Sequence, residues 1–418
     1  MRVAIYDNLA NSAYIEAKAL RRRGVEADVL LDPRDRFVMS DPRWEELDLE
    51  LPTERLLEPD ALPEAEIPAW VRREPSRSSA RAARYARAAL AAARAPGAAA
   101  LALRRAGPTG LELPLDREWV MRAMRGYDCV VTYGHGSALA ALAGAPCIAR
   151  TWGGDITIVP FADETAGASR RERANARLQR LGFGSCRRLI LSEPRYREHA
   201  ERLGLAAKAE FLPLLVDVER YSPGDEEKLR ARFLPADDGA LVFVPSRQDW
   251  RWKGSDRMLR GFALAASARD DVFLVCAGWG SDLERSQTLV STLGIDDRVH
   301  FLPCALSKRR LLRYFRAADV VADQFTLGWY GGATFDAMSC GKPVLVHIDL
   351  ERYREDIAEA PPVANVSTPE EIAAALRRLL TDPDERKRLG AAARRYILAR
   401  HGDPLLDRLI ELYRTSSE

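Results

Sequence analysis

Short apolar runs alternate with amphipathic helical patterns along most of the chain. It opens with an apolar run at 2–8, a helical pattern at 12–23 that ends at Gly24, and a second apolar run at 25–32. Further strand-like runs follow at 129–134, 146–151, 188–193 and 210–224, the last of which runs into a linker. Because strands alternate with helices, the first half is expected to form a doubly wound α/β domain with a parallel sheet.

The same alternation starts again near residue 240. Ser255 and Thr368 are predicted N-caps of helices in this half, and Pro369 follows the second cap. Strands are predicted at 240–246, 271–278, 298–303, 319–324 and 343–348, and helices at 254–267, 307–318, 367–380 and 383–399. We therefore predict two Rossmann-like doubly wound domains that face a cleft at the carboxyl ends of their strands, where ligands of such sheets bind.

Composition narrows the class of protein. A net charge of +2 gives no reason to expect a nucleic-acid partner, and no run of about 18 apolar residues is present to cross a membrane. The first residues form a strand pattern rather than a signal peptide, and the six cysteines lack a CxxC pair, which suits a cytoplasmic protein. The five histidines show no metal-binding spacing, so neither a metal nor a bound cofactor is expected.

The stretch GWYGGATFDAMSCGKPV at 328–344 places two glycines directly before a helical pattern. Glycine lets a ligand approach the backbone closely, and the amides at a helix start suit an anion. Gly331 and Gly332 therefore form either a phosphate seat or a tight strand-to-helix turn. Arg247 and Lys253 favour the phosphate seat, because their loop follows a strand of the same domain and would reach the same sheet edge.

Asp336 lies one turn into the same helical pattern, on what helical spacing predicts to be an exposed face. Its carboxylate could accept hydrogen bonds from a ribose diol. Alternatively, it could serve only the helix dipole, an effect of about a few tenths of a kcal/mol.

Five segments of the second half stand in a recognisable order and spacing: LPLLVDVERYSP, SRQDWRWKGSDRML, VCAGWGSDLE, VHFLPCALSKRRLLRYFRAADVVAD and GGATFDAMSCGKPVL. By these segments the second half resembles the C-terminal domain of group 1 glycosyltransferases (family 4, retaining, GT-B fold). The resemblance is weaker over 1–200, where WGGD at 152–155 is similar to the family's acceptor-side loop. It implies a nucleotide-diphosphate-sugar donor bound mainly by the second domain, transfer with retention of configuration, and a last helix that crosses back to the first domain.

These features together predict the domain organisation. Residues 1–215 would form the N-terminal acceptor-binding domain, with an insertion and Arg/Ala-rich helices at about 33–125. Residues 216–395 would form the C-terminal donor-binding domain. Residues 396–418 would form the helix that returns to the N-terminal domain.

Carried over by position, the family's donor site falls on the second domain. Arg247 and Lys253 would neutralise the diphosphate, the glycine amides would bind diphosphate or sugar, and Asp336 would hold the ribose. A backbone contact to the base is expected at Pro303–Cys304. The predicted donor-binding residues are Arg247, Lys253, Gly278, Pro303, Cys304, Gly331, Gly332, Ala333 and Asp336.

The chain departs from the family's paired-glutamate motif at both acidic positions. Asp336 replaces the second Glu and is one methylene shorter, and Gly328 stands at the first position, whose Glu normally contacts donor-sugar hydroxyls. Asp323 and Gln324 are nearby polar substitutes. The departure motivates an alternative function, a catalytically weakened homologue that binds a nucleotide sugar or a partner protein. A periplasmic-type binding protein and an NAD-dependent enzyme are less favoured, because the sequence shows neither a signal peptide nor GxGxxG after its first strand.

Transfer would need a stabilised leaving diphosphate and an oriented acceptor hydroxyl. Asp155 and His135 follow strands of the first domain and could orient the acceptor or take its proton. Asp155 could equally be a turn residue, and His135 a structural residue at a strand-to-helix junction. The predicted catalytic residues are Asp155, His135, Arg247 and Lys253, and the predicted acceptor contacts are Asn8, Asn11, Tyr14 and Trp152.

Arginines cluster at 72–105 and at 170–180. Such helices could rest on anionic lipid headgroups, at about 1 kcal/mol per cation, which would suit a lipid-linked acceptor. The alternative, a solvated helix, is favoured by the small number of apolar side chains in the first cluster. We therefore expect a cytoplasmic protein that uses a nucleotide-sugar donor and a carbohydrate, lipid-linked or small-molecule acceptor, with peripheral contact to the inner membrane face as an open possibility.

Overall fold

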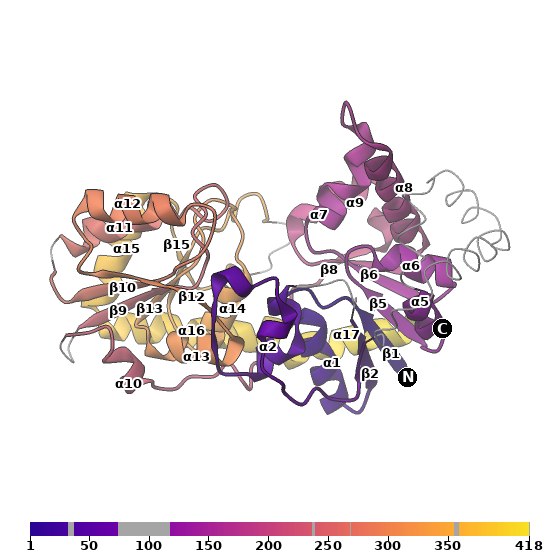
Figure 1. Ribbon diagram of the computed structural model, residues 1–418, viewed down its shortest axis with the longest axis horizontal. Helices are drawn as coiled ribbons and strands as arrows, with labels where there is room; N and C mark the ends of the chain where they lie inside the picture. Colours follow the sequence, from indigo (N-terminus) through magenta and orange to yellow (C-terminus); the bar gives the residue numbers. More distant parts are fainter. Residues whose placement is uncertain (32–36, 74–117, 236–238, 268, 355–358, 418) are drawn as a thin grey trace. The chain divides into compact units, whose positions relative to one another are not determined.

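The computed structural model describes residues 1–31, 37–73, 118–235, 239–267, 269–354 and 359–417, and the chain divides into two compact units (Figure 1). The first unit comprises Met1–Arg36, Ile67–Leu215 and Leu405–Glu418, and the second comprises Phe37–Glu66 and Val216–Pro404. Each unit is built on a parallel sheet with helices on its faces, so the predicted Rossmann-like α/β class is confirmed.

The sheet of the first unit has the strand order β4-β2-β1-β5-β6-β7-β8, and all its strand pairs are parallel. Its strands are β1 Arg2–Tyr6, β2 Glu26–Leu30, β4 Val71–Arg72, β5 Cys129–Thr132, β6 Cys147–Arg150, β7 Arg188–Leu191 and β8 Ala209–Phe211. Its helices are α1 Ser12–Arg22, α5 Glu118–Met124, α6 Gly136–Ala143, α7 Gly154–Thr157, α8 Arg170–Ser185, α9 Arg197–Arg202 and α17 Asp403–Thr415, the last from Leu405 onward.

The side chains of β1 show how the two faces of this sheet are filled. Val3 and Ile5 belong to a buried cluster that includes residues of α1 and α17. Ala4 and Tyr6 belong to a second buried cluster, which includes residues of α5, α6, α8 and α9. Because successive strand residues point to opposite faces, this alternation places helices on both sides of the sheet.

A buried ion pair joins α1, β6 and α17 within the first unit. Glu16 and Arg150 are each 1% exposed, and Oε2 of Glu16 lies 2.6 Å from Nη1 of Arg150. The Tyr413 hydroxyl donates to the other carboxylate oxygen of Glu16, and Arg150 also donates to the Pro213 carbonyl at 2.6 Å. Removal of one partner would leave a buried charge uncompensated, so these contacts hold the C-terminal helix in the unit.

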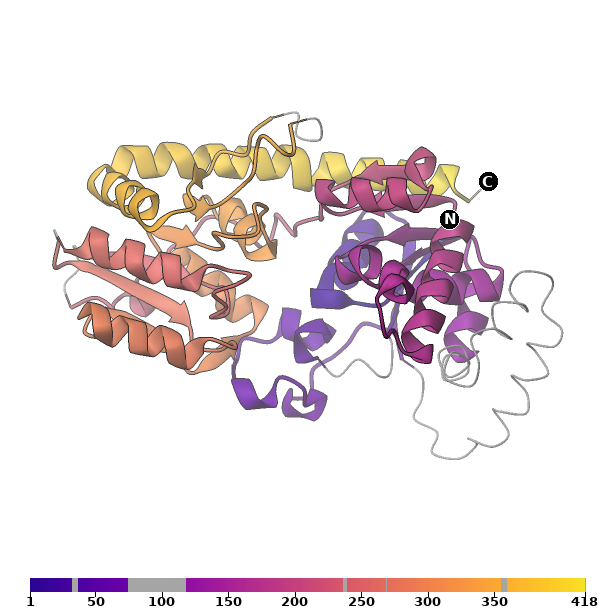
Figure 2. The same cartoon turned by 90° about the horizontal axis from the view of Figure 1, so that it is seen from above.

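The sheet of the second unit has the strand order β11-β10-β9-β13-β14-β15, also with parallel pairs. Figures 1 and 2 show helices on both of its faces. Its strands are β9 Ala240–Val244, β10 Val272–Ala277, β11 Val299–Leu302, β13 Val320–Ala322, β14 Val344–Val346 and β15 Ala364–Asn365. Its helices include α10 Glu227–Arg230, α11 Ser255–Ala266, α12 Leu283–Leu293, α13 Lys308–Ala317, α14 Gly332–Ser339, α15 Pro369–Thr381 and α16 Pro383–His401.

The central strand β9 packs against different partners on its two faces. Val242 and Val244 lie in a cluster with residues of α11, α12 and α15. Phe243 points to the other face, where its ring centroid lies 5.3 Å from Tyr314 and 5.7 Å from Phe315, both in α13. This two-sided burial explains why the strand reads as a continuous apolar run.

The segment Phe37–Glu66 belongs to the second unit, which corrects the prediction that the whole insertion at 33–125 is part of the N-terminal domain. Its strand β3 (Glu50–Pro52) pairs antiparallel with β12 (Cys304–Leu306). The Ser307 hydroxyl donates to the Leu47 carbonyl at 2.7 Å and accepts from the Leu49 amide at 2.9 Å. Three-residue strands are too short for a recognisable alternation, so the sequence pattern could not reveal this pairing.

Two helix starts test the capping predictions. Thr368 caps α15 as predicted, in a capping box in which it accepts from the Glu371 amide. The predicted cap at Ser255 is wrong, because Gly254 occupies that position in a left-handed conformation. The Ser255 hydroxyl instead accepts a hydrogen bond from the Asp249 amide at 2.8 Å.

The C-terminal segment changes unit later than predicted. Helix α16 extends to His401, and the first unit takes up the chain at Leu405 rather than at residue 396. Most of the first arginine cluster, from residue 74 onward, lies outside the described residues. Within the part of the chain that the structure describes, none of the helices combines the length and the apolar character that crossing a bilayer requires.

Candidate functional site

Each sheet contains a point at which the strand order reverses. In the first unit β1 lies between β2 and β5, and in the second unit β9 lies between β10 and β13. The connections that leave such a pair of strands diverge, which opens a crevice at the carboxyl ends of the strands. We call these places the β1/β5 switch point and the β9/β13 switch point. The loops that follow these strands hold most of the predicted site residues.

Asp249 organises the loop that follows β9. Its carbonyl accepts hydrogen bonds from the amides of Lys253 at 2.9 Å and Gly254 at 3.1 Å. Its carboxylate accepts from the Trp252 amide at 2.9 Å and from the Arg247 guanidinium at 2.8 Å. The Arg247 side chain is 38% exposed, so Asp249 orients this cation and leaves it accessible. The structure thus places both predicted cations in one ordered loop.

The Lys253 ammonium lies at the β9/β13 switch point. Its Nζ donates to Oε1 of Gln324 at 2.5 Å, and the amide nitrogen of Gln324 donates to the Trp329 carbonyl. A Cβ built on Gly331 would lie 3.9 Å from Lys253 Nζ and 3.9 Å from Gln324 Oε1. Gln324 is a neutral partner, so this contact does not compensate the positive charge of Lys253. The Asp323 carboxylate also lies at this place, 3.3 Å from the same Cβ.

Asp323 joins the start of α14 to the loop after β9. Its carboxylate accepts hydrogen bonds from the Ser246 hydroxyl and, at 2.6 Å, from the Thr334 hydroxyl. The residue is only 3% exposed. Asp323 and Gln324 were predicted as polar substitutes for the missing first acid, but their contacts make them supports of the loop instead.

The first turn of α14 presents backbone amides at the same place. The first intrahelical hydrogen bonds run from Thr334 and Phe335 to the Gly331 carbonyl, so the amides of Gly332 and Ala333 precede them. A Cβ built on Gly332 would meet no atom within 4 Å, which means that a ligand can approach the backbone here. Together with the neighbouring ammonium, these amides can seat an anion of phosphate size.

Asp336 lies on the buried face of α14, so the prediction of an exposed face is wrong. The residue is 7% exposed, and its Oδ2 lies 3.0 Å from Nζ of Lys308. Burial raises the pKa of Asp336, and the Lys308 ammonium opposes this shift. Burial also raises the pKa of Glu45 to about 7, against the opposing charges of Lys308 and Arg220. Asp336 is therefore engaged in an internal ion pair, which does not agree with its predicted contact to ribose.

The remaining predicted donor residues lie after β10 and β11. A Cβ on Gly278 would overlap the Leu302 carbonyl oxygen, which accepts a hydrogen bond from the Gly278 amide at 2.9 Å. Cys304 is buried and pairs with Pro52 through β12 and β3, whereas Pro303 is exposed. Gly278 is thus required by packing, and the predicted base contact would fall on one exposed residue, Pro303, and one buried residue, Cys304, of which Cys304 belongs to the β3–β12 pair.

The first acidic position of the family motif is occupied by a glycine that the backbone favours. Gly328 has φ +69°, a conformation that side-chain-bearing residues rarely adopt. A Cβ built there would lie 3.2 Å from Cβ of Asp349, whose amide donates to the Gly328 carbonyl at 2.9 Å. A side chain at position 328 would therefore be strained with this backbone conformation.

The β1/β5 switch point carries a tightly hydrogen-bonded loop. Asp7 and Asn11 have left-handed backbone conformations, with φ values of 72° and 62°. The Asn8 side chain donates to Oδ1 of Asn11 at 2.7 Å and accepts from the Tyr14 amide at 2.9 Å. Tyr14 stacks on Trp70 with a centroid separation of 5.1 Å. Asn8, Asn11 and Tyr14, predicted as acceptor contacts, are buried and support this loop.

Asp155 makes the contacts of a turn residue. Its Oδ1 accepts hydrogen bonds from the amides of Trp152 at 2.9 Å and Gly153 at 2.8 Å. Burial raises the pKa of Asp155, and these amide contacts oppose the rise. The Trp152 ring lies edge-on to Tyr133 with a centroid separation of 6.0 Å. Trp152 and Asp155, both predicted from the WGGD segment, are thus neighbours, and the Asp155 carboxylate stabilises the turn that joins them.

His135 follows β5 and contacts Gln179, a residue of α8 that was not among the predicted site residues. Its Nδ1 lies 3.0 Å from Oε1 of Gln179, whose Nε2 donates to the Gly134 carbonyl at 3.0 Å. Asp7 is close by, since its Oδ2 lies 3.5 Å from a Cβ built on Gly134. Asp7 could have been found from its place after the first strand. Gln179 has no such signal, because its contact depends on how α8 packs.

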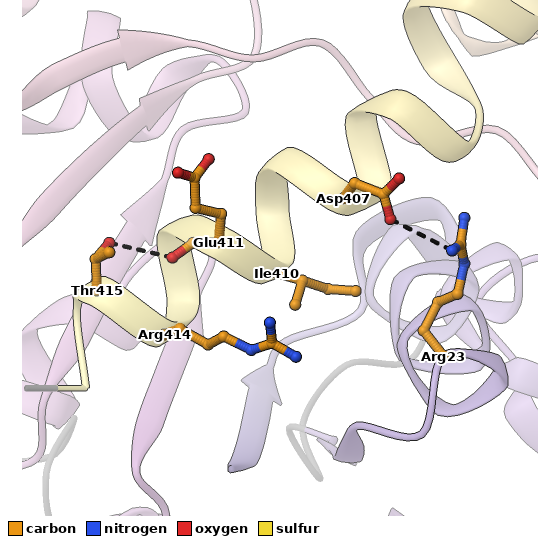
Figure 3. A pocket seen from close by; sticks show the side chains of 6 residues that line it. All are labelled: Arg23, Asp407, Ile410, Glu411, Arg414 and Thr415. Atoms are coloured by element: carbon orange, nitrogen blue, oxygen red, sulfur yellow. Dashed lines mark hydrogen bonds and ion pairs between the residues drawn. The ribbon is translucent and has the colours of Figure 1, made fainter.

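A hollow of about 420 Å³ lies on α17, and none of the predicted site residues lines it (Figure 3). Arg23 pairs with Asp407 across it at 3.4 Å. Its lining residues are Arg23, Asp407, Ile410, Glu411, Arg414 and Thr415. The lining contains as many acids as arginines, so it offers no net charge to a phosphate.

Comparison with known families decides the class of the second unit. Residues 225–396 match the family described as Glycosyl transferases group 1. This stretch is a group 1 glycosyl transferase domain. The resemblance found in the sequence is therefore confirmed, and Arg247, Lys253, Gly331 and Gly332 all lie within the group 1 domain, whereas His135 and Asp155 lie outside it.

Curated relatives carry glycosyltransferase names. The D-inositol 3-phosphate glycosyltransferase of Mycolicibacterium smegmatis is 37% identical over 134 residues, which cover 31% of this chain and 30% of the relative. The enzyme of the same name from Saccharomonospora viridis is 33% identical over 215 residues, 48% of each chain. The matches thus span about a third to a half of the length of these relatives.

Solved structures share the fold of the whole chain. Anabaena HepE in complex with UDP and glucose has a TM-score of 0.64 with 16% identity and covers 100% of both chains. Sucrose-phosphate synthase from Thermosynechococcus elongatus has a TM-score of 0.62 with 17% identity and covers 99% of this chain and 98% of its own. At these identities the likeness shows the fold, so the group 1 domain belongs to a chain with the GT-B fold.

Proposed function

We propose that the protein is a glycosyltransferase that moves a sugar from a nucleoside-diphosphate sugar to a hydroxyl group. The observation that carries this proposal is the convergence of Lys253, Gly331 and the starting amides of α14 at the β9/β13 switch point. An ammonium beside backbone amides matches the charge and the acceptor oxygens of a diphosphate. The family of the domain and the UDP in the HepE structure support this choice of donor.

In the proposed reaction, the bond between the anomeric carbon and the diphosphate oxygen breaks, and the acceptor oxygen bonds to that carbon. The leaving diphosphate keeps both electrons of the broken bond, so negative charge grows on it in the transition state. Lys253, Arg247 and the α14 amides would stabilise this charge without further reorganisation. We assign His135 to orient the acceptor hydroxyl or take its proton, and retention of configuration follows the family resemblance.

The acceptor and the compartment are proposed from separate observations. The relatives' name makes D-inositol 3-phosphate the first acceptor to test, ahead of glycan and lipid-linked alcohols. All six cysteines are buried free thiols, which supports a reducing cytoplasmic compartment.

A second candidate is a weakened homologue that binds a nucleotide sugar without transfer. It is favoured by the glycine at position 328 and by the internal ion pair of Asp336, since both acidic positions of the family motif depart from its pattern. Binding without turnover in the presence of all acceptors would select it over the transferase.

Thermal unfolding with UDP-, GDP-, ADP-, CDP- and TDP-sugars tests the donor site first. A ligand that binds the folded state raises the melting temperature by mass action, and about 100 times Kd corresponds to about 2.7 kcal/mol. One nucleotide class should stabilise the wild type and fail to stabilise Arg247→Ala/Lys253→Ala. Lys387→Ala, which removes an exposed lysine of α16, is the matched control and should respond like the wild type. Equal stabilisation of the double variant would overturn the assignment of the pocket.

A further inference from the structure

The contact between His135 and Gln179 determines how the imidazole carries its proton. Gln179 lies in α8 and is completely buried. One of its two amide atoms lies 3.0 Å from the Gly134 carbonyl oxygen, and the other lies 3.0 Å from Nδ1 of His135. A carbonyl oxygen can only accept a hydrogen bond, so the Gln179 atom that faces Gly134 must be the amide nitrogen.

The orientation of the amide then sets the role of the imidazole. With its nitrogen committed to Gly134, Gln179 turns its oxygen toward His135. That oxygen can only accept, so Nδ1 of His135 must carry the proton and donate it. In a neutral imidazole the second nitrogen, Nε2, is then the one with a lone pair.

The packing of α8 against α6 holds Gln179 in this place. A Cβ built on Gly182 would lie 2.5 Å from the Ser137 hydroxyl oxygen, so only glycine allows the two helices to come this close. Gln179 lies three residues before Gly182, on the same face of α8. The close approach at Gly182 therefore brings the Gln179 amide to the residues just before α6.

We propose that Gln179 is a positioning residue that keeps His135 in the tautomer protonated on Nδ1, so that Nε2 accepts a hydrogen bond or a proton from a sugar or acceptor hydroxyl. This rests on the proposed function for the identity of the hydroxyl, but the tautomer itself does not depend on it. Asp7 is a charged group that the described residues place near this pair, because its carboxylate lies 3.5 Å from a Cβ built on Gly134. Asp7 would favour a positive imidazole, whereas the neutral Gln179 amide selects the tautomer without adding charge.

The direct test is a long-range proton–nitrogen NMR spectrum of protein labelled with nitrogen-15 in its five histidine rings. The His135 signals are identified by their loss in His135→Asn. The expected wild-type spectrum shows His135 protonated on Nδ1, and Gln179→Leu should shift it toward the form protonated on Nε2. Gln287→Leu, which changes an exposed glutamine of α12, should leave the signals unchanged. A wild-type His135 protonated on Nε2, or a Gln179→Leu spectrum identical to the wild type, would overturn the proposal.

A second variant separates positioning from simple support of the fold. Gln179→Glu keeps an oxygen toward His135 and replaces the amide nitrogen that donates to the Gly134 carbonyl with a second oxygen. When ionised, its carboxylate adds a negative charge that stabilises the imidazolium. The acidic limb of the transfer rate should therefore move to higher pH, whereas Gln179→Leu should lower kcat by about tenfold or more with little change in the KM for the donor. Two results would contradict a positioning role for Gln179. One is an acidic limb in Gln179→Glu at the same pH as in the wild type, and the other is an effect of Gln179→Leu on KM alone.

The two proposals fail in distinguishable ways. If the spectra show the expected tautomer but His135→Asn retains full transfer activity, the role of His135 in the proposed function is wrong and the positioning by Gln179 stands. If transfer depends on His135 while its tautomer is insensitive to Gln179→Leu, the role of His135 stands and the positioning by Gln179 is wrong. If Gln179→Leu does not fold, the wild-type spectrum and the Gln179→Glu pH profile still decide the question.

Discussion

At the β9/β13 switch point a lysine ammonium lies beside a glycine and the starting amides of a helix, whereas at the β1/β5 switch point an imidazole lies against a buried glutamine amide. The two sheets have the same construction at these places, because in each the first strand of the sheet in chain order lies between two later strands. The topology therefore supplies two crevices, and the loop residues decide which chemistry each can perform.

The difference between the two places lies in charge and in access. The loops around β9 and β13 present a positive charge and open backbone, which suit a charged diphosphate. The loops around β1 and β5 hold an imidazole that contacts the Gln179 amide, with the Asp7 carboxylate nearby, which suits a hydroxyl group that must be held and relieved of its proton. A fold that binds donor and acceptor needs both kinds of site, and the predictions below test whether the division is real.

The largest expected effect is on turnover at the β1/β5 switch point. His135→Asn should reduce kcat by about 100-fold, because a neutral amide cannot accept the hydroxyl proton. Stabilisation by the donor should be unchanged, since donor binding is assigned to the other unit. Steady-state kinetics and donor titration measure the two effects separately. Loss of donor binding in His135→Asn would contradict the assignment of donor binding to the β9/β13 switch point alone.

The next effect is on donor binding at the β9/β13 switch point. Lys253→Ala should weaken binding of the nucleoside-diphosphate sugar by more than about tenfold, because the diphosphate loses a charge-assisted contact. Isothermal titration of the wild type, Lys253→Ala and Lys387→Ala provides the measurement and its control. Unchanged affinity in Lys253→Ala would remove the lysine from the site.

The third prediction concerns pH and Glu45, a buried acid near Lys308 and Arg220. The pKa of Glu45 is raised to about 7 from an ordinary value of 4.5, chiefly by burial, so the folded state favours the protonated form. Lys308, Arg220, Asp336 and Glu46 are the charged groups that face it. The stabilising contribution is thus complete below pH 4.5 and is lost as the pH rises through about 7.

Glu45→Gln should remove this dependence. The melting temperature of Glu45→Gln relative to that of the wild type should rise by about 5–10 °C between pH 5 and pH 8. This corresponds to about 2–3 kcal/mol from the raised pKa of Glu45, at about 2–4 °C per kcal/mol. Calorimetry at the two pH values measures the difference. Parallel pH curves for the two proteins would show that Glu45 titrates normally. Glu54→Gln changes an exposed acid of the same segment and is the control.

The smallest effect separates ligand access from folding at the start of α14. Gly332→Ala should keep or slightly raise the melting temperature, because alanine favours the helix by about 0.5–1 kcal/mol and the added Cβ meets no atom within 4 Å. The same methyl group should obstruct a bound diphosphate and weaken the donor about threefold. Unfolding curves with and without donor show both effects, and equal donor affinity would place the ligand elsewhere.

Much of the architecture could be predicted because its signals are local. The strand at 240–244 is a continuous apolar run, and the helix at 369–381 begins with a threonine cap, a proline and two acids. The segment Phe37–Glu66 could not be assigned to its unit, because its strand of three residues pairs with a partner more than 250 positions away in the chain. The predicted cap at Ser255 was wrong for a related reason, because the Ser255 hydroxyl accepts a hydrogen bond from the Asp249 amide instead of from the helix.

The candidate site divides in the same way. The sequence by itself determined that Lys253, Gly331 and His135 lie in loops that follow strands, because the order of apolar runs and breaks along the chain contains this information. Only the tertiary structure decided that Asp336 faces Lys308 in the interior and that Gln179 reaches His135. The physical reason is that burial and hydrogen-bond orientation depend on neighbours that other elements bring, 28 residues away for Asp336 and 44 for Gln179. The type of a side chain and its spacing along the sequence do not indicate which neighbours these will be.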